Sequence, residues 1–344
     1  MELHDQRNLD LPQAARLNSA ATTPTIGLVV PCYNEEEVLA ETSRRLLELL
    51  AQMQAEGLCS TDSSVFYIDD GSRDRTWALI QELSTQHAAI CGIKLSRNRG
   101  HQNALMAGLL VAPGDALISV DADLQDDLDV IPKMVKALRN GDDIVYGVRR
   151  KRTTDTFFKR FTAEGYYKLL AAMGVQIIFN HADYRLMSRR TLESLREYKE
   201  VNLFLRGLMP LLGYRTSTVE YDRAERFAGE SKYPIGKMLS LAWQGVTSFS
   251  TYPLRLITGI GTVISLISLS LASWALITRL FTDEALPGWA STVIPMYFLG
   301  GVQLLSLGVI GEYVAKIYNE TKGRPRFHVD VLEGAAFKRT RRES

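Results

Sequence analysis

The sequence predicts an α/β fold with a largely parallel sheet, followed by two long apolar helices. Two observations support this prediction. The C-terminal third contains two stretches without any charged residue, at 256–278 and 285–311. The first half holds short apolar runs that each end in a polar turn, which is typical of strands that alternate with helices. These runs are residues 26–30, 65–68, 116–120 and 144–148.

The first strand candidate, residues 26–30, leads into Pro31-Cys32-Tyr33-Asn34 and three glutamates. Because proline has no N–H for the strand ladder, we expect Pro31 to end this strand. Asn34 can cap the helix that follows, and the glutamates at 35–37 favour its positive end. We therefore expect a short turn from strand to helix here.

The second strand candidate, residues 65–68, leads into Asp69-Asp70-Gly71-Ser72 and then Asp74. Gly71 permits a tight turn, and Ser72 or Asp74 can cap the next helix. One of the two adjacent aspartates, Asp69 or Asp70, is expected to serve only as a turn or cap residue.

The third strand candidate, residues 116–120, is followed directly by Asp121, Asp123 and Gln125. In a parallel sheet the carboxyl ends of the strands share one edge, where open α/β sheets bind ligands. Carboxylate oxygens suit Mg²⁺ or Mn²⁺, which also accept substrate phosphates as ligands. This stretch therefore indicates metal-dependent handling of a phosphorylated substrate, although a solvated acidic turn remains an alternative on these residues alone.

Composition limits the remaining classes of protein. The 344 residues suffice for about two domain-sized units, and the net charge is +1. Since no basic stripe interleaved with aromatic residues occurs, nucleic acid is excluded as a partner. The three cysteines, Cys32, Cys59 and Cys91, have no CxxC spacing and are expected to be buried, reduced thiols. The polar N-terminus, residues 1–24, does not have the pattern of a signal peptide and is expected to be a mobile tail.

The two uncharged stretches are each long enough for a membrane-spanning helix, which needs about 20 apolar residues. The turn between them is short, so they predict a helical hairpin with both outer ends on one side. Basic residues flank the outer ends, whereas the turn carries Arg279 against Asp283 and Glu284. The positive-inside rule then puts the rest of the chain and both termini in the cytoplasm. The flanking basic residues are Lys237, Arg255, Lys316, Lys322, Arg324 and Arg326.

Several motifs occur together in a fixed order. They are PCYNEEE at 31–37, DDGSRDRT at 69–76, LSRNRGHQ at 95–102, DADLQD at 121–126, DYRLMSR at 183–189 and RFAGESK at 226–232. With this set, residues 25–255 resemble the inverting family 2 glycosyltransferases with a GT-A (Rossmann-like) fold. Within them the chain is similar to the polyprenyl-phosphate sugar transferases, which include bactoprenol glucosyltransferases of the GtrB type and dolichol-phosphate mannose synthase.

The resemblance implies a division of the chain into functional parts. The catalytic domain is expected at 25–234, and a juxtamembrane segment at 235–255 either lies in the headgroup plane or packs on that domain. The membrane helices are expected at about 256–278 and 288–311, within 256–312, and form a candidate surface for homo-oligomers. A basic cytoplasmic tail is expected at 313–344, and its basic run at 338–342 is expected to be solvated or to touch anionic lipid.

The resemblance also implies roles for individual residues. Asp123 and Gln125 are expected to hold Mg²⁺ or Mn²⁺, together with Asp121, which also lies in the nucleotide-sugar region. Asp121, Asp123 and Asp183 are the expected catalytic residues. Asp183 would orient the acceptor or sugar or act as a base, the alternative being a structural ion pair with Arg185. The expected nucleotide-sugar contacts are Pro31, Tyr33, Glu35, Asp69, Asp70, Asp121 and Arg149, with Asp70 preferred over Asp69 for the base. The expected phosphate or acceptor contacts are Arg149, Arg226 and Lys232.

The implied activity is metal-dependent, inverting transfer of one sugar from a nucleotide-sugar to polyprenyl phosphate. UDP-glucose is the preferred donor, and GDP-mannose or a UDP-aminoarabinose type donor is the alternative. A processive polysaccharide synthase is disfavoured because the chain lacks a Gln-x-x-Arg-Trp motif and further spans. A non-catalytic membrane scaffold on a transferase fold is disfavoured by the intact set of acidic residues.

Overall fold

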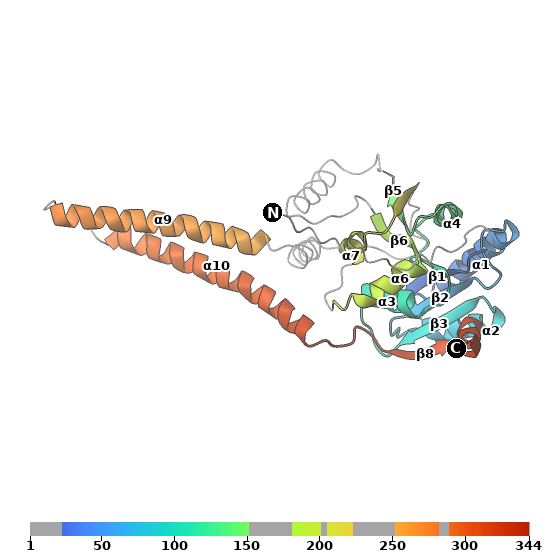
Figure 1. Ribbon diagram of the computed structural model, residues 1–344. Helices are drawn as coiled ribbons and strands as arrows, with labels where there is room; N and C mark the ends of the chain where they lie inside the picture. Colours follow the sequence, from blue (N-terminus) through green and yellow to red (C-terminus); the bar gives the residue numbers. More distant parts are fainter. Residues whose placement is uncertain (1–22, 151–180, 201–204, 223–251, 282–288, 344) are drawn as a thin grey trace.

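A computed structural model describes residues 23–150, 181–200, 205–222, 252–281 and 289–343. The expected N-terminal tail, most of the juxtamembrane segment, and Arg226 and Lys232 lie outside these ranges. Within them the chain forms an α/β domain and a pair of long helices that extend away from it (Figure 1).

The α/β domain is built on an eight-stranded mixed sheet with the strand order β7-β5-β6-β4-β1-β2-β3-β8. The four strands β4, β1, β2 and β3 are parallel neighbours, while β6 and β8 run antiparallel to the strands beside them. The strands are β1 (Ile26–Cys32), β2 (Ser64–Asp69), β3 (Ile90–Leu95), β4 (Ala116–Ser119), β5 (Ile144–Arg149), β6 (His181–Ser188), β7 (Thr216–Tyr221) and β8 (Val329–Glu333). The four strands expected from apolar runs are therefore confirmed, with four more between and beside them.

Strand β1 continues through Pro31, so the expectation that Pro31 ends it is wrong. Pro31 pairs with Ile68 and Cys32 with Asp69 in the parallel ladder with β2. The Cys32 carbonyl accepts a hydrogen bond from Asp70 N and therefore points toward β2. The backbone groups of Pro31, one residue earlier, point the opposite way, toward β4. On that side the β1–β4 ladder ends at the pair of Val29 and Ser119, so the missing N–H of Pro31 lies beyond the ladder.

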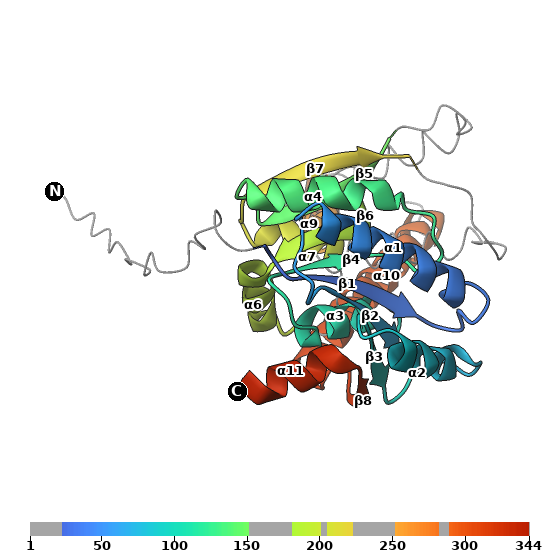
Figure 2. The same ribbon diagram turned by 90° about the vertical axis from the view of Figure 1, so that its right-hand side faces the viewer.

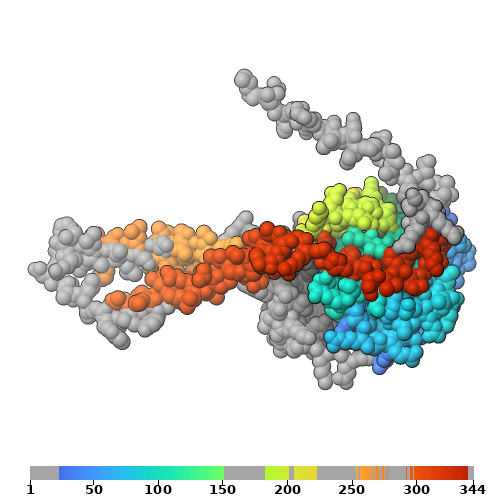
Figure 3. Space-filling model, turned by 90° about the horizontal axis from the view of Figure 1, so that it is seen from below, coloured from blue at the N-terminus to red at the C-terminus, as the bar shows by residue number. Residues whose placement is uncertain are grey.

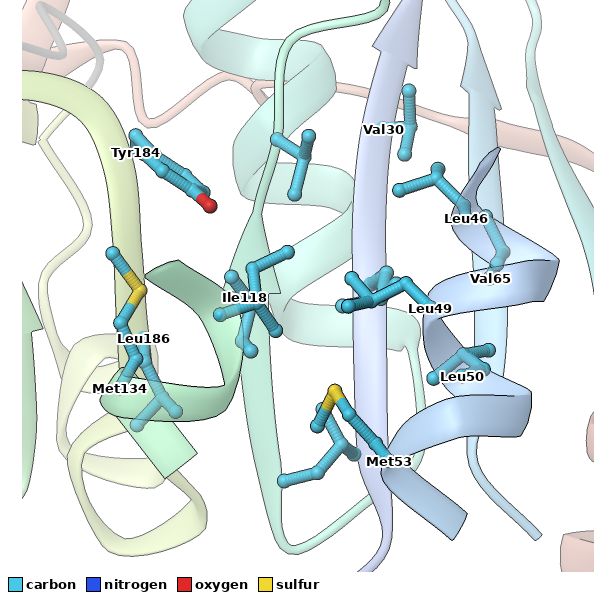
Figure 4. Packing of buried hydrophobic residues seen from close by; sticks show 14 of the residues in the cluster. Val30, Leu46, Leu49, Leu50, Met53, Val65, Ile118, Met134, Tyr184 and Leu186 are labelled. Carbon is cyan, nitrogen blue, oxygen red and sulfur yellow. The ribbon is translucent and has the colours of Figure 1, made fainter. Parts of the chain in front are cut away.

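Helices cover both faces of the sheet (Figure 2). One face packs against α1 (Leu39–Ala55), α2 (Thr76–Gln86) and α4 (Ile131–Arg139), the last of which follows the short 3₁₀ turn η2 (Leu128–Val130). The other packs against α3 (His101–Val111), α6 (Arg189–Glu197), α7 (Leu205–Leu211) and α11 (Ala335–Glu343). Alternate residues of β1 serve the two cores, since Leu28 and Val30 face the first and Val29 the second. Figure 4 shows the first core, where Leu46, Leu50 and Met53 of α1 meet the strands.

Helix α3 lies unusually close to the sheet because Gly108 has no side chain. A Cβ added there would collide with Val29 and Ile68. Since α3 begins at the site edge of the sheet, this close packing fixes the position of its first residues.

Part of the C-terminal segment at 313–344, for which a basic tail was expected, packs on the sheet domain. Strand β8 pairs antiparallel with β3, and α11 follows it, with Ala336 buried in the second core. The Phe337 ring meets the Phe66 ring edge-on with 5.6 Å between centroids. Figure 3 shows this segment in red against the surface of the domain. The alternating apolar residues of β8 were obscured by the charges beside them, Asp330 and Glu333.

Helices α9 (Tyr252–Phe281) and α10 (Trp289–Thr321) lie side by side (Figure 1). Large apolar side chains on them are exposed, with Leu304 73 % and Leu269 65 % accessible. In the part of the chain that the structure describes, one segment, Phe298–Thr321, is long and apolar enough to cross a membrane. Helix α10 runs on past the expected end of the second span at residue 311, into the polar residues that lead to β8.

Candidate active site

The candidate site lies at the edge of the sheet where β1, β2, β4 and β5 end and β6 begins. The antiparallel register pairs Ser119 of β4 with Arg185 of β6. The residues just beyond Ser119 therefore lie opposite those just before Arg185. This register brings Asp121 and Asp183 to the same place, although 62 residues separate them in the sequence.

The turns after β1 and β2 are joined by a network of hydrogen bonds. Asn34 does not cap α1, which begins only at Leu39; it adopts a left-handed conformation with φ of 56°. Its N–H donates to Ser72 Oγ at 3.0 Å, and its Oδ1 accepts from Arg73 N at 2.9 Å. Three more hydrogen bonds from backbone N–H groups join the two turns: Glu35 N donates to Thr76 Oγ1, Glu36 N to Asp74 Oδ2, and Arg75 N to Glu36 Oε2.

A pocket of about 500 Å³ opens beside these joined turns, lined by Asn34, Glu35, Glu36, Glu37, Val38, Arg73 and Asp74. Of the expected nucleotide contacts, Glu35 lines this pocket. Tyr33 stands next to it in sequence with 42 % of its surface exposed, whereas Pro31 is buried in β1. An exposed ring of this kind offers a face on which a base can stack.

The two aspartates after β2 have different tasks. Asp70 accepts backbone N–H groups from Arg99 at 2.7 Å and Gly100 at 2.8 Å, so both of its oxygens hold the turn before α3. Burial raises the pKa of Asp70, and these two hydrogen bonds oppose that rise. Asp69 uses Oδ1 to accept Ser72 N, and among the described residues its buried Oδ2 has no hydrogen-bond partner. Asp70 therefore holds the turn before α3 with both oxygens, whereas Asp69 keeps one carboxylate oxygen without a partner among the described residues.

The close approach of these turns depends on Gly71. Its φ is 70°, and a Cβ added there would lie 2.6 Å from the backbone N of Asn98. Only glycine combines this conformation with this spacing, so Gly71 lets the β3–α3 turn reach the Asp70 carboxylate.

Asp121, Asp123 and Gln125 lie on one tight turn after β4. Leu124 between them has φ of 54°, and Gln125 N donates to Asp123 Oδ1 at 3.3 Å. The pKa of Asp121 is raised to about 6, chiefly by burial, while His101 opposes the rise and the carboxylates of Asp126, Asp183 and Asp123 add to it. His101 Nε2 stands 3.8 Å from Asp121 Oδ1 and 4.0 Å from Asp183 Oδ2.

This turn fits a hard divalent cation. Crowded carboxylates that raise the pKa of Asp121 are stabilised when a cation enters, and their oxygens and the Gln125 amide are suitable donors. Among the residues that the structure describes, no three His, Cys, Asp or Glu side chains form a metal-binding group. A cation here would therefore depend on two carboxylates, the amide oxygen and phosphates of a bound substrate, as Mg²⁺ commonly does.

Asp183 forms the ion pair with Arg185 that was the alternative to a catalytic role. Arg185 Nη2 donates to Asp183 Oδ1 at 2.5 Å, and Arg206 Nη2 donates to Oδ2 at 3.3 Å. Burial alone would raise the pKa of Asp183, but the two guanidinium groups and His101 lower it to about 2. A carboxylate with this pKa is a weak base at neutral pH, which favours positioning over proton abstraction.

Arg149, at the end of β5, is held by two side chains that sequence reasoning missed. Its Nε donates to Tyr221 Oη at 3.1 Å, and its Nη2 lies 3.5 Å from Asp126 Oδ1. Tyr221 Oη in turn donates to the same Asp126 oxygen at 2.5 Å. Asp126 belongs to the DADLQD motif, but nothing in the sequence indicates that Tyr221, 95 residues later, is its partner.

The comparisons with known proteins agree with this geometry. Residues 28–196 match the profile of glycosyl transferase family 2. The uncharacterized glycosyltransferase YkoT of Bacillus subtilis (strain 168) is 49 % identical over 310 residues, covering 90 % of this chain and 92 % of that protein. The bactoprenol glucosyl transferase of Shigella phage SfX is 40 % identical over 303 residues, 88 % of this chain and 97 % of that protein.

A solved structure, glucosyl-3-phosphoglycerate synthase from Mycobacterium tuberculosis, aligns with a TM-score of 0.44 and 19 % identity over 65 % of this chain and 78 % of that one.

The match to the family model and the identity to named glycosyltransferases, over a mixed α/β sheet, identify a glycosyltransferase with a GT-A, Rossmann-like fold. The extent of identity to full-length relatives then settles its family: the chain belongs to glycosyl transferase family 2.

Proposed function

We propose that this glycosyltransferase transfers one glucose from UDP-glucose to polyprenyl phosphate at the cytoplasmic face of a membrane. The observation that carries the proposal is the 40 % identity to a bactoprenol glucosyl transferase over 88 % of this chain. The alignment leaves at most 41 residues of this chain outside, and α9 and α10 together contain more residues than that. The similarity therefore includes part of the apolar helices as well as the sheet domain.

The exposed apolar surface of α9 and α10 supports a lipid-borne acceptor. Side chains such as Leu269 and Leu304 are apolar and exposed, on helices that extend away from the sheet domain (Figure 1), an arrangement that is costly in water. We infer that both helices span the bilayer as a hairpin. A polyprenyl chain would then stay in the bilayer while its phosphate reaches the site.

The site residues can meet the chemical demands of the reaction. A cation held by Asp121, Asp123 and Gln125 would stabilise the negative charge that develops on the nucleoside diphosphate as it leaves. Arg149, at the end of β5 on the same edge of the sheet, can bind a phosphate of donor or acceptor. A phosphomonoester has a second pKa near 6, so the acceptor is already largely dianionic at neutral pH and attacks with little help from a base. This agrees with an Asp183 that is held as an ion pair.

The proposal is tested with the purified full-length protein in detergent, with Mg²⁺, polyprenyl phosphate and a panel of nucleotide-sugars. Mass spectrometry of the lipid should detect hexosyl-phosphate polyprenol with UDP-glucose as the best donor. A better yield with a GDP-mannose or UDP-aminoarabinose type donor would replace the sugar but keep the acceptor. Glycosylation of water-soluble sugars or proteins in place of the lipid would overturn the proposal.

The metal assignment has its own test. Asp123→Asn should abolish transfer, because losing a ligand at the leaving group costs several kcal/mol of barrier. Asp129→Asn makes the same change in charge at an exposed position six residues further on and should keep normal activity. Near-normal turnover by Asp123→Asn with Mg²⁺ or Mn²⁺ present would remove Asp123 from the metal site. Arg226→Ala and Lys232→Ala test the remaining proposed phosphate contacts and should lose transfer more than stability.

A further inference from the structure

Three elements far apart in the chain meet at the guanidinium group of Arg149. Arg149 is the last residue of β5, Tyr221 is the last residue of β7, and the two are paired in the parallel ladder. Asp126 comes from the turn after β4 that also carries the proposed metal ligands. The hydrogen bonds run in one direction: Arg149 Nε donates to the Tyr221 hydroxyl, which donates to the Asp126 carboxylate.

The burial of these groups differs in an informative way. Asp126 is 4 % exposed and Tyr221 is 1 % exposed, whereas 31 % of the Arg149 side chain is open to solvent. The two partners are thus fixed within the protein, and the guanidinium group lies at its surface. A guanidinium has five N–H donors, and the hydrogen bond to Tyr221 uses one of them. Most of its donors therefore remain suited to a ligand.

Tyr221 is itself fixed in place. Its ring packs edge-on against the Tyr184 ring with 5.3 Å between centroids. The Tyr184 hydroxyl donates to the backbone carbonyl of Asp127 at 2.9 Å, so it also holds the turn next to Asp126. The Asp126 Oδ2 atom is buried and has no hydrogen-bond partner among the described residues. A buried carboxylate with one oxygen unsatisfied costs stability, which argues for a role beyond folding.

We propose that Asp126 and Tyr221 are positioning residues that hold the Arg149 guanidinium toward the phosphate of a bound substrate. The proposal rests on the proposed function, in which Arg149 binds a donor or acceptor phosphate. A free arginine side chain loses considerable rotamer entropy when it is immobilised on a ligand. The fixed carboxylate and hydroxyl impose that order before substrate arrives. They also tie Arg149 to the turn that carries Asp121, Asp123 and Gln125, the residues that would hold the cation.

The first experiment removes both hydrogen bonds of the Tyr221 hydroxyl while keeping the aromatic ring. Tyr221→Phe should weaken binding of UDP or of a short-chain polyprenyl phosphate about 2- to 10-fold, because a guanidinium that is held less firmly weakens its phosphate contact by about the value of one hydrogen bond. Affinities are measured for the purified full-length protein, each probe separately, together with KM and kcat for transfer. A rise in KM with little change in kcat is the expected pattern, because the loss concerns substrate phosphate binding.

The second experiment is chemical rescue. Arg149→Ala should lose transfer and recover it in part when millimolar guanidinium ion is added, since Asp126 and Tyr221 still form its binding site. Rescue should disappear in the double variants Arg149→Ala/Asp126→Asn and Arg149→Ala/Tyr221→Phe. If Asp126 and Tyr221 only stabilised the fold, rescue of Arg149→Ala by guanidinium ion would not depend on them.

Asp143→Asn is the matched control, because Asp143 lies just before β5, at the opposite end from Arg149. It is 6 % exposed, pairs with Arg190 and accepts a hydrogen bond from Ser188. This variant should lose stability yet bind UDP and polyprenyl phosphate as the wild type does.

Normal affinity for both probes in Tyr221→Phe, or guanidinium rescue that persists without Asp126, would overturn the positioning proposal. Failure of the proposed function has a different signature. The wild type would then make no lipid product, while Tyr221→Phe would still bind UDP more weakly than the wild type.

Discussion

The ion pair between Asp183 and Arg185 permits a quantitative prediction for Asp183→Asn. The pKa of Asp183 is lowered from an ordinary value of 3.8 to about 2. Since one pKa unit corresponds to about 1.4 kcal/mol, the ionised carboxylate stabilises the fold by roughly 2 kcal/mol at neutral pH. The substitution also leaves the fully buried Arg185 without its closest partner, so the total loss should be about 3–5 kcal/mol.

The pH dependence follows from the direction of the shift. The folded-state pKa lies below the unfolded value, so the stabilisation is fully present above about pH 4. It is lost as the pH falls toward 2, where the folded-state carboxylate takes up its proton. The difference in stability between wild type and Asp183→Asn should therefore be constant from pH 5 to 8 and shrink by about 2 kcal/mol between about pH 4 and 2.

The measurement is thermal unfolding of the purified full-length protein in a nonionic detergent, followed by intrinsic fluorescence. For a domain of this size, 1 kcal/mol corresponds to about 2–4 °C in Tm, so Asp183→Asn should lower Tm by at least about 6 °C at pH 7. An unchanged Tm would refute the ion-pair reasoning. An acidic limb in the wild-type pH–rate profile that vanishes in Asp183→Asn would instead establish Asp183 as the catalytic base.

Two further predictions concern the C-terminal half. Phe337→Ala should destabilise the domain by less than the roughly 3–5 kcal/mol that a fully buried phenylalanine contributes, because Phe337 packs edge-on against Phe66 at the margin of the core. Lys133→Ala, at an exposed site, is the control. If Phe337→Ala and Lys133→Ala had the same, unchanged Tm, α11 would not be packed on the sheet. A cysteine placed at Thr282 should react with an impermeant maleimide from outside the cell, and one at Ser344 only after permeabilisation; labelling of both from one side would rule out the two-span hairpin. The three native cysteines are buried and unpaired, so they should not react in the folded protein.

The sequence was informative where a buried strand is a continuous apolar run. The runs that became β1, β2, β4 and β5 are continuous apolar segments, because helices cover both sides of the sheet there. Strand β3 was missed because Gly92 and Lys94 interrupt its apolar run. Strand β7 was missed because it is the exposed edge of the sheet and alternates between exposed and half-buried residues.

The same limit applies to the site. Acidic turns at the ends of apolar strands identified Asp121, Asp123 and the Asp69–Asp70 pair, since each signal is local. The partners that decide what the side chains do come from other parts of the chain. Arg99 and Gly100 occupy Asp70, and Arg206 shares Asp183 with Arg185. Only the sheet register and the packing of α3 and α7 bring these groups together.

The C-terminal strand gives the apolar helices a physical connection to the site. Helix α10 ends at Thr321, and a short segment leads from it to β8 beside β3. On the way, the His328 carbonyl accepts a hydrogen bond from Ser96 N, at the start of the β3–α3 turn. That same turn supplies the N–H groups that hold Asp70 and ends in His101, between Asp121 and Asp183. The bond from Ser96 N to the His328 carbonyl, and the bonds from Arg99 N and Gly100 N to Asp70, therefore connect the segment after α10 to the acidic edge of the sheet. A flexible tail in this position would leave the distance between the helices and the site undefined.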